Sequence, residues 1–152
     1  TKSIVAAEAY ALHQDRLKSD AVAEYDPYIA HRLSGGQNIS AADYINMLAT
    51  REKIWADVQV MTQHFDALIL PTSPILPPAL RTLDTIEVKT ATNASCIRNT
   101  SLSNYLDRPT ITLPCHSLGT APVGISLMGP RLHDRHLLAI ASGVEKVINT
   151  TR

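Results

Sequence analysis

Two short apolar runs, joined by a turn and followed by an amphipathic stretch, most constrain how this chain can fold. The runs are Thr110 to Leu113 and Val123 to Met128, and the stretch begins at Asp134. Short apolar runs bounded by Pro and Gly are typical of strands buried in a sheet. The stretch after Asp134 repeats apolar residues at helical spacing, and the Asp134 carboxylate can cap the first N–H groups. The pattern therefore predicts strand, turn, strand, turn and helix.

A third strand is predicted upstream, at Phe65 to Leu70, and it also reads as buried on both faces. The segment Pro71-Thr72-Ser73-Pro74 ends it, because proline cannot donate to a ladder. Three buried strands separated by long connections predict an α/β fold with a mixed sheet flanked by helices. Three strands are few for helices of this length, so we expect other residues to complete a larger sheet.

Three helices are predicted before the first strand. The first runs from Ile4 to Leu17, and the second begins at Asp26-Pro27 and stops at Gly35-Gly36, with Asp as N-cap and Pro at the first helical position. The third runs from about Ala41 to His64. It begins with a capping box, in which Asp43 follows Ser40 by three residues.

The remaining segments give weaker patterns. Residues 75–92 are rich in Pro, Thr and Leu without a clean period and are predicted to be loop, and a short helix is predicted between Ala94 and Asn104. No linker or repeat interrupts the 152 residues, a length ordinary for one domain. We therefore expect residues 1–152 to form a single unit without an internal boundary.

Charge and cysteine content exclude several classes of function. The 14 basic and 14 acidic residues cancel, and no segment concentrates Lys and Arg, so nucleic-acid binding is not expected. No apolar run approaches the ~20 residues that span a bilayer, so no membrane association is expected. Cys96 and Cys115 make no disulfide framework, which favours reduced thiols in a cytoplasmic protein.

Several motifs occur together in a fixed order. Asp66 to Pro74 reads DALILPTSP, Asn99 to Cys115 ends in PTITLPC, and Ala121 to Pro130 reads APVGISLMGP. Upstream, Ser40 to Arg51 reads SAADYINMLATR. Together with Asp134 and its helix, this series resembles the C-terminal portion of the amidase signature hydrolases. The sequence departs from that pattern at Leu106-Asp107-Arg108 and at His116.

The resemblance implies hydrolysis of linear amides without metal or organic cofactor. In that family a Lys activates a bridging Ser, which activates a nucleophilic Ser in a Gly/Ser-rich loop. Gly35-Gly36 has no serine cluster around it, and no lysine of this chain has the context of the catalytic one: Lys2, Lys18, Lys53, Lys89 and Lys146. We therefore assign no catalytic residue and no metal ligand here. The catalytic Ser-Ser-Lys region is expected in a missing N-terminal part of the same enzyme.

Three candidate substrate-binding residues follow from the resemblance: Arg32, Thr100 and Asn104. Arg32 matches a position that binds a substrate carboxylate in some relatives, but it equally suits the C-terminal end of its own short helix. Thr100 and Asn104 fall in a segment that runs near the substrate pocket in relatives, although an Asn there can instead tie down loop backbone. Thr72 and Ser73 are interpreted first as turn residues.

The predicted function is the C-terminal segment of an amidase that hydrolyses linear carbon–nitrogen amide bonds of a small-molecule substrate. In this role the chain contributes scaffold and a pocket wall and is inactive alone. The alternative is a non-catalytic assembly module that forms a homo-oligomer or pairs with a catalytic chain. A part of a tRNA amidotransferase is less supported, because no basic surface for RNA is evident.

Overall fold

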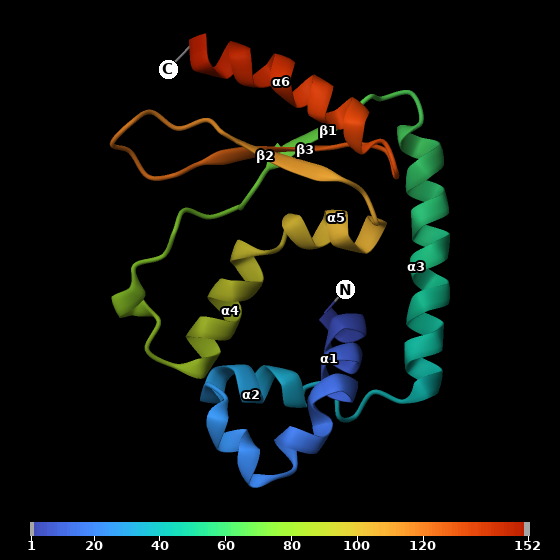
Figure 1. Cartoon of the computed structure of the whole chain (residues 1–152), viewed down its shortest axis with the longest axis vertical. Coiled ribbons are helices and arrows are strands. Elements are labelled where there is room, and N and C mark those ends of the chain that lie inside the picture. Colours follow the sequence, from blue (N-terminus) through green and yellow to red (C-terminus); the bar gives the residue numbers. More distant parts are fainter. Residues whose placement is uncertain (1, 151–152) are drawn as a thin grey trace. The chain divides into compact units, whose positions relative to one another are not determined.

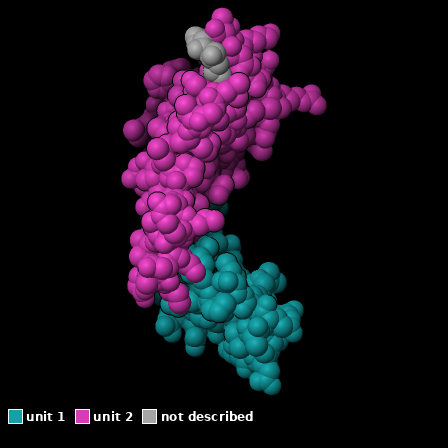
Figure 2. Space-filling view, turned by 90° about the vertical axis from the view of Figure 1, so that its left-hand side faces the viewer, with its two compact units in different colours: residues 1–55 teal, residues 56–152 magenta. Residues whose placement is uncertain are grey.

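A computed structural model describes residues 2–150 of the chain, in two compact units (Figures 1 and 2). The first unit is residues 1–55 and the second is residues 56–152. The boundary falls inside the long helix α3 (Ala41–Thr62). The expectation of a single domain stays a prediction.

The first unit is helical and begins with α1 (Lys2–Leu17), the short 3-10 helix η1 (Asp20–Glu24) and α2 (Pro27–Ser34). As predicted, the Asp26 side chain caps α2 by accepting from the backbone N–H groups of Tyr28 and Ile29. Gly36, just after α2, lies directly on α1: a Cβ added there would be 2.0 Å from the Ala6 carbonyl oxygen. Only glycine allows this approach of the two backbones.

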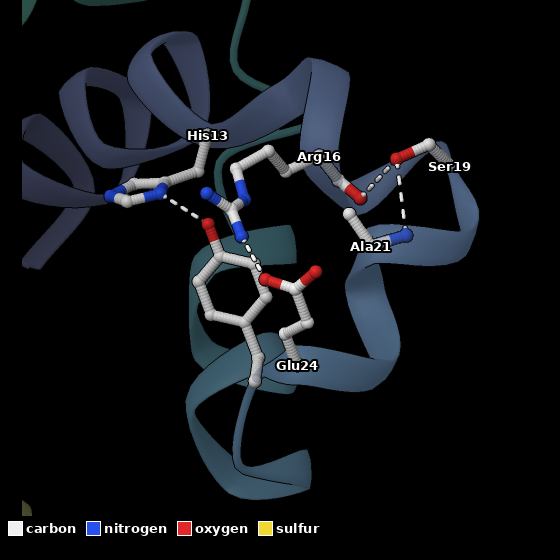
Figure 3. A network of polar contacts seen from close by, with 6 residues as sticks. His13, Arg16, Ser19, Ala21 and Glu24 are labelled. Atoms are coloured by element: carbon white, nitrogen blue, oxygen red, sulfur yellow. Dashed lines mark hydrogen bonds and ion pairs between the residues drawn. The ribbon is translucent and has the colours of Figure 1, made fainter.

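Polar contacts fix the turn between α1 and η1 (Figure 3). Arg16 forms an ion pair with Glu24, and His13 Nδ1 lies 2.7 Å from the Tyr25 hydroxyl. Ser19 caps η1 by accepting from the Ala21 backbone N–H at 3.3 Å, and its hydroxyl donates to the Arg16 carbonyl at 3.1 Å.

The start of α3 is the predicted capping box. The Ser40 Oγ accepts from the Asp43 backbone N–H at 3.0 Å, and the Ser40 backbone N–H donates to the Asp43 carboxylate at 3.3 Å. Tyr44 then reaches back to α1, where its hydroxyl donates to Glu8 at 2.8 Å. None of the residues of α3 is fully buried, so its apolar stripe is only partly covered by the residues that the structure describes.

The second unit holds a three-stranded sheet in the order β1-β3-β2, with helices on both sides (Figure 1). The strands are β1 (Leu68–Pro71), β2 (Thr110–Pro114) and β3 (Gly124–Met128). The α/β fold with a sheet flanked by helices is confirmed. The mixed strand directions expected from the sequence are not found among these three strands, since both pairings are antiparallel. The short connection between β2 and β3 permits a hairpin, and a hairpin is antiparallel.

The core of this unit lies between the sheet and α6 (Asp134–Thr150). Leu113 and Leu127 point from the sheet toward Leu137 and Ala141 of α6, and all four are at most 4% exposed. Burying one leucine side chain stabilises a fold by roughly 1.5–3 kcal/mol, so these contacts hold α6 on the sheet. In Figure 1, α5 (Thr100–Leu106) lies on the opposite side of the sheet from α6.

Two local predictions were wrong in this unit. Strand β1 is not buried on both faces, because its Ile69 is 67% exposed on an edge strand. The segment predicted to be loop contains η2 (Leu80–Thr82) and the first half of α4 (Ile86–Cys96). Thr85 caps α4 by accepting from the Val88 backbone N–H, a start signal that the irregular spacing of apolar residues hides.

Candidate functional site

Two hollows flank the sheet of the second unit. The first, here called the sheet-end hollow, has a volume of about 390 Å³ and lies where β1 and β2 end and β3 begins. The second, the corner hollow, has a volume of about 360 Å³ and lies where α5 turns into β2, beside the loop before α6. The two hollows differ in the chemistry of their linings.

Three hydroxyl groups lie together across the strands at the sheet-end hollow. Ser126 Oγ shares a hydrogen bond with Thr72 Oγ1 at 2.8 Å and another with Thr112 Oγ1 at 3.1 Å, and the two threonine oxygens are 3.3 Å apart. Thr72 and Thr112 line the hollow, while Ser126 is only 2% exposed. We call these three residues the hydroxyl cluster.

The strand register explains why the cluster forms. Thr112 is the cross-strand partner of Ser126, and the ladder continues past β1 because the Thr72 backbone N–H donates to the Gly124 carbonyl at 2.9 Å. Side chains alternate between the faces of a strand, so Ser126 points away from α6 while its neighbour Leu127 points toward it. At Gly124 a Cβ would lie 2.8 Å from Thr112 Cγ2 and 3.0 Å from Thr72 Oγ1, and glycine therefore leaves the hydroxyls room.

The rest of the sheet-end hollow is mostly apolar. Its walls include Pro74, Ile75, Leu76 and Val123, and its one ionisable side chain among the described lining residues is His116. The His116 ring faces backbone, with Nδ1 3.2 Å from the Val123 carbonyl oxygen and 3.3 Å from the Val123 nitrogen. Hydroxyls beside an apolar wall suit a neutral group that both donates and accepts hydrogen bonds, such as an amide.

Nothing in this lining activates a hydroxyl as a nucleophile. Such activation needs an adjacent general base within hydrogen-bond reach. Over the described residues, each cluster hydroxyl is bonded to the others, and His116 forms no recorded hydrogen bond with any of them. The described lining of this hollow can therefore hydrogen-bond a ligand, but it contains no general base that bonds the cluster hydroxyls.

The corner hollow is polar and charged. Asn104, Arg108 and Arg131 contribute to its lining, and Arg131 forms an ion pair with Asp107 at 2.6 Å. Arg108 is only 8% exposed, and burial lowers the pKa of its guanidinium. The Ser103 hydroxyl, also buried, donates to the Thr100 carbonyl at 2.8 Å, within the first turn of α5.

The structure places the three predicted substrate-binding residues differently. Asn104 is exposed on α5 and lines the corner hollow. Thr100 begins α5, where its hydroxyl donates to the Ile97 carbonyl at 3.1 Å, and it lines neither hollow. Arg32 belongs to the first unit, and its guanidinium lies 5.7 Å from the centroid of the Tyr28 ring. The roles of all three in substrate binding stay predictions.

Two features of these hollows were missed from the sequence. Ser126 is a polar residue within the apolar run Gly124–Met128, and a single polar position inside a buried strand was the signal that could have found it. Arg108 was noted only as a departure from the family pattern. Arg108 precedes Pro109, and nothing in the local sequence indicates that this arginine side chain is buried.

The described residues show no sign of a metal centre or a membrane span. Over residues 2–150, no three His, Cys, Asp or Glu side chains are grouped to hold a metal ion. Within the same range, none of the helices combines the length and hydropathy that crossing a bilayer requires. His136 instead bonds Asp66, with Nε2 3.2 Å from the carboxylate.

The comparisons with known proteins agree with one family. The model of the Amidase family matches residues 3–138. The chain belongs to this family. A solved structure described as the crystal structure of an amidase superposes with a TM-score of 0.81 at 25% identity, over 95% of this chain and 34% of that one. The C-terminal resemblance inferred from the motifs is thereby confirmed at the level of the family.

Two curated proteins are similar to this chain in sequence. The 2-amino-5-chloromuconic acid deaminase of Comamonas testosteroni is 30% identical over 95% of this chain, which spans 31% of the deaminase. The indoleacetamide hydrolase of Pseudomonas syringae pv. syringae is 35% identical over 79% of this chain, which spans 26% of the hydrolase. The chain thus spans about a third or less of the length of these relatives.

Proposed function

We propose that this chain forms part of a larger amidase that hydrolyses carbon–nitrogen amide bonds, and that its role there is to supply scaffold and one wall of the acyl pocket. The observation that carries the proposal is the sheet-end hollow, which combines an apolar wall with the hydroxyl cluster. Membership of the Amidase family supports an amide substrate. The free thiols of Cys96 and Cys115 favour the cytoplasm as its location.

On this proposal the chain is inactive alone. The hydroxyl cluster has no general base within its hydrogen bonds, so the nucleophile, bridging serine and lysine come from residues outside 1–152. Asn104, Thr100 and Arg32 are proposed to contact substrate only in the assembled enzyme, where the remaining residues complete the pocket.

The test is an assay of ammonia release by the purified chain. Propionamide, benzamide and indoleacetamide are incubated with the chain, and turnover above a buffer control is expected for none of them. The gene region upstream of residue 1 is read in parallel, and the longer product, if encoded, is expected to release ammonia. Turnover by residues 1–152 that Ser126→Ala abolishes would contradict the proposal.

The second candidate function is a non-catalytic module that self-associates or pairs with a catalytic chain. It is favoured by one observation: over the described residues β1 and β2 are both edge strands, and Ile69 on β1 is largely exposed. Open edges pair readily with other chains. A sizing experiment on the purified chain separates a monomer from a stable oligomer, and a stable oligomer without activity in the longer product would favour this function.

A further inference from the structure

Arg108 is a buried cation without an anionic partner among the described residues. It sits between α5 and β2, and its side chain reaches the end of α3, where Nη2 donates to Thr62 Oγ1 at 2.6 Å and to Gln59 Oε1 at 3.5 Å. Both acceptors are neutral. None of the ion pairs recorded over residues 2–150 involves Arg108, and its Nε is buried without a hydrogen-bond partner.

This arrangement is costly as it stands. A buried charge costs several kcal/mol unless it is paired, and a buried N–H donor left unsatisfied adds roughly 1–3 kcal/mol. A guanidinium presents its donors in a planar fork that matches the two oxygens of a carboxylate. The buried Nε–H of Arg108 has no partner among the described residues, and it belongs to the fork of donors that a carboxylate satisfies best.

The corner hollow beside Arg108 also stores backbone strain. The two non-glycine residues with positive φ in the described chain are Asp107, at 54°, and Leu132, at 63°, and both line this hollow. Asp tolerates the left-handed conformation at a helix end, but a leucine there is a genuine outlier. Strained residues of this kind cluster at ligand sites, where the surrounding structure holds them in place.

From these observations we propose that the corner hollow binds a small monocarboxylate, whose oxygens pair with the guanidinium of Arg108. The charges around the hollow select this class. Its lining carries two guanidinium groups, of Arg108 and Arg131, and two carboxylates, of Asp107 and Asp134, so its formal charge is zero. A single negative charge fits this balance better than a phosphate dianion, which the two aspartates repel.

Residues at the rim give the ligand both access and a neutral contact. Leu132 is 85% exposed and Asn104 is exposed, so the rim is open to solvent and presents one apolar and one amide side chain. Because Nε of Arg108 is buried, a carboxylate reaches it only when side chains that line the hollow move aside. The inference does not depend on the proposed amide hydrolysis, since every residue it uses lies within the described chain.

The test follows the Arg108 side chain directly in the intact chain. The protein is labelled with ¹⁵N-arginine, and the Nε–H signal of Arg108 is assigned by its loss in Arg108→Lys. Acetate, propionate and benzoate are titrated at constant ionic strength, with acetamide, benzamide, chloride and phosphate as matched additions. Saturable movement of this signal is expected with the carboxylates and not with the neutral amides, chloride or phosphate.

Variants then assign the binding. Arg108→Gln removes the charged fork and is expected to weaken carboxylate affinity about tenfold or more, since a charge-assisted hydrogen bond contributes about 1.5–3 kcal/mol. Arg81→Gln, at an exposed arginine of η2, is the matched control and is expected to bind as the unaltered chain does.

Several outcomes would overturn the inference. It fails if the Arg108 signal does not move, if chloride or phosphate moves it as far as carboxylates do, or if Arg108→Gln binds undiminished. If the Arg108 signal instead moves with protein concentration and not with added carboxylate, the group bound to Arg108 is a carboxylate of a second copy of the chain. If Arg108→Gln does not fold, the titration of the unaltered chain still decides.

Discussion

Ser126, on the central strand, links the hydroxyls of Thr72 and Thr112. Removing its hydroxyl should therefore lower the free energy of unfolding. Ser126→Ala deletes the hydrogen bonds to Thr72 and Thr112, although these two threonines can still bond one another across 3.3 Å. A net contribution of about 1 kcal/mol per hydrogen bond predicts a loss of about 1–2 kcal/mol in the free energy of unfolding. Urea unfolding followed by circular dichroism measures it.

The control for this prediction is Ser117→Ala, in the exposed loop between β2 and β3. A surface substitution of this kind is expected to change the free energy of unfolding by no more than about 0.5 kcal/mol. Equal losses in the free energy of unfolding for Ser117→Ala and Ser126→Ala would mean that the hydroxyl cluster does not stabilise the fold.

At this scale the sequence predicted contacts within helices better than contacts across strands. Asp26 and Ser40 were recognised as caps because the capping side chain and its N–H partners lie within four residues of one another. Ser126 and Thr72 are separated by 54 positions, and their contact depends on strand register, which no local pattern fixes.

The packing of α1 against α2 rests on one glycine. In Gly36→Ala the new Cβ would meet the Ala6 backbone, 2.0 Å from its oxygen and 2.6 Å from its carbon, so one of the two helices must shift. Overpacking of this kind costs about 1–3 kcal/mol or more. We expect a lower unfolding midpoint, together with faster amide hydrogen exchange in α1 and α2.

Gly143, within α6, provides the matched control. A Cβ at this position meets nothing within 4 Å, and alanine favours a helix interior by about 0.5–1 kcal/mol over glycine. Gly143→Ala should therefore stabilise the chain, and loss of stability in both variants would refute the steric explanation for Gly36.

The cap of α3 predicts a pH dependence. Hydrogen bonds from Ser40, first from its side chain and then from its backbone, lower the pKa of Asp43 in the folded chain. A lowered carboxyl pKa adds stability that is fully present above the unfolded pKa of about 3.9 and is lost as the pH falls through the folded value. The difference in unfolding midpoint between the unaltered chain and Asp43→Asn should therefore shrink on acidification below about pH 4.

Thermal unfolding of both proteins at a series of pH values between about 2 and 7 checks this prediction. A difference that stays constant across that range, or that grows on acidification, would show that the Asp43 carboxylate does not act through its charged form. Ser40→Ala removes the side-chain hydrogen bond that contributes most to the lowered pKa of Asp43. The unfolding midpoint of this variant should therefore fall less on acidification than that of the unaltered chain.

At the scale of the molecule, the order of elements was predictable and the burial of the strands was not. Helix starts at Pro27, Ala41 and Asp134 followed from local signals. Burial on both faces was inferred from an apolar strand sequence, but it depends on what covers the strand. In the described chain Ile69 has no such cover, since it is 67% exposed.

An uncovered edge strand predicts how the isolated chain behaves in solution. Ile69 lies opposite the buried Leu127 yet is 67% exposed, so β1 combines an edge position with exposed apolar surface. We expect reversible association that grows with concentration, and Ile69→Lys should weaken it because an edge lysine places a charge where another strand would pair. Leu118→Lys is the control: Leu118 is 97% exposed but lies in the loop between β2 and β3.

Sedimentation velocity over a range of protein concentrations measures the average mass. A decrease for Ile69→Lys alone assigns association to the β1 edge, whereas an equal decrease for both variants assigns it to exposed apolar surface in general.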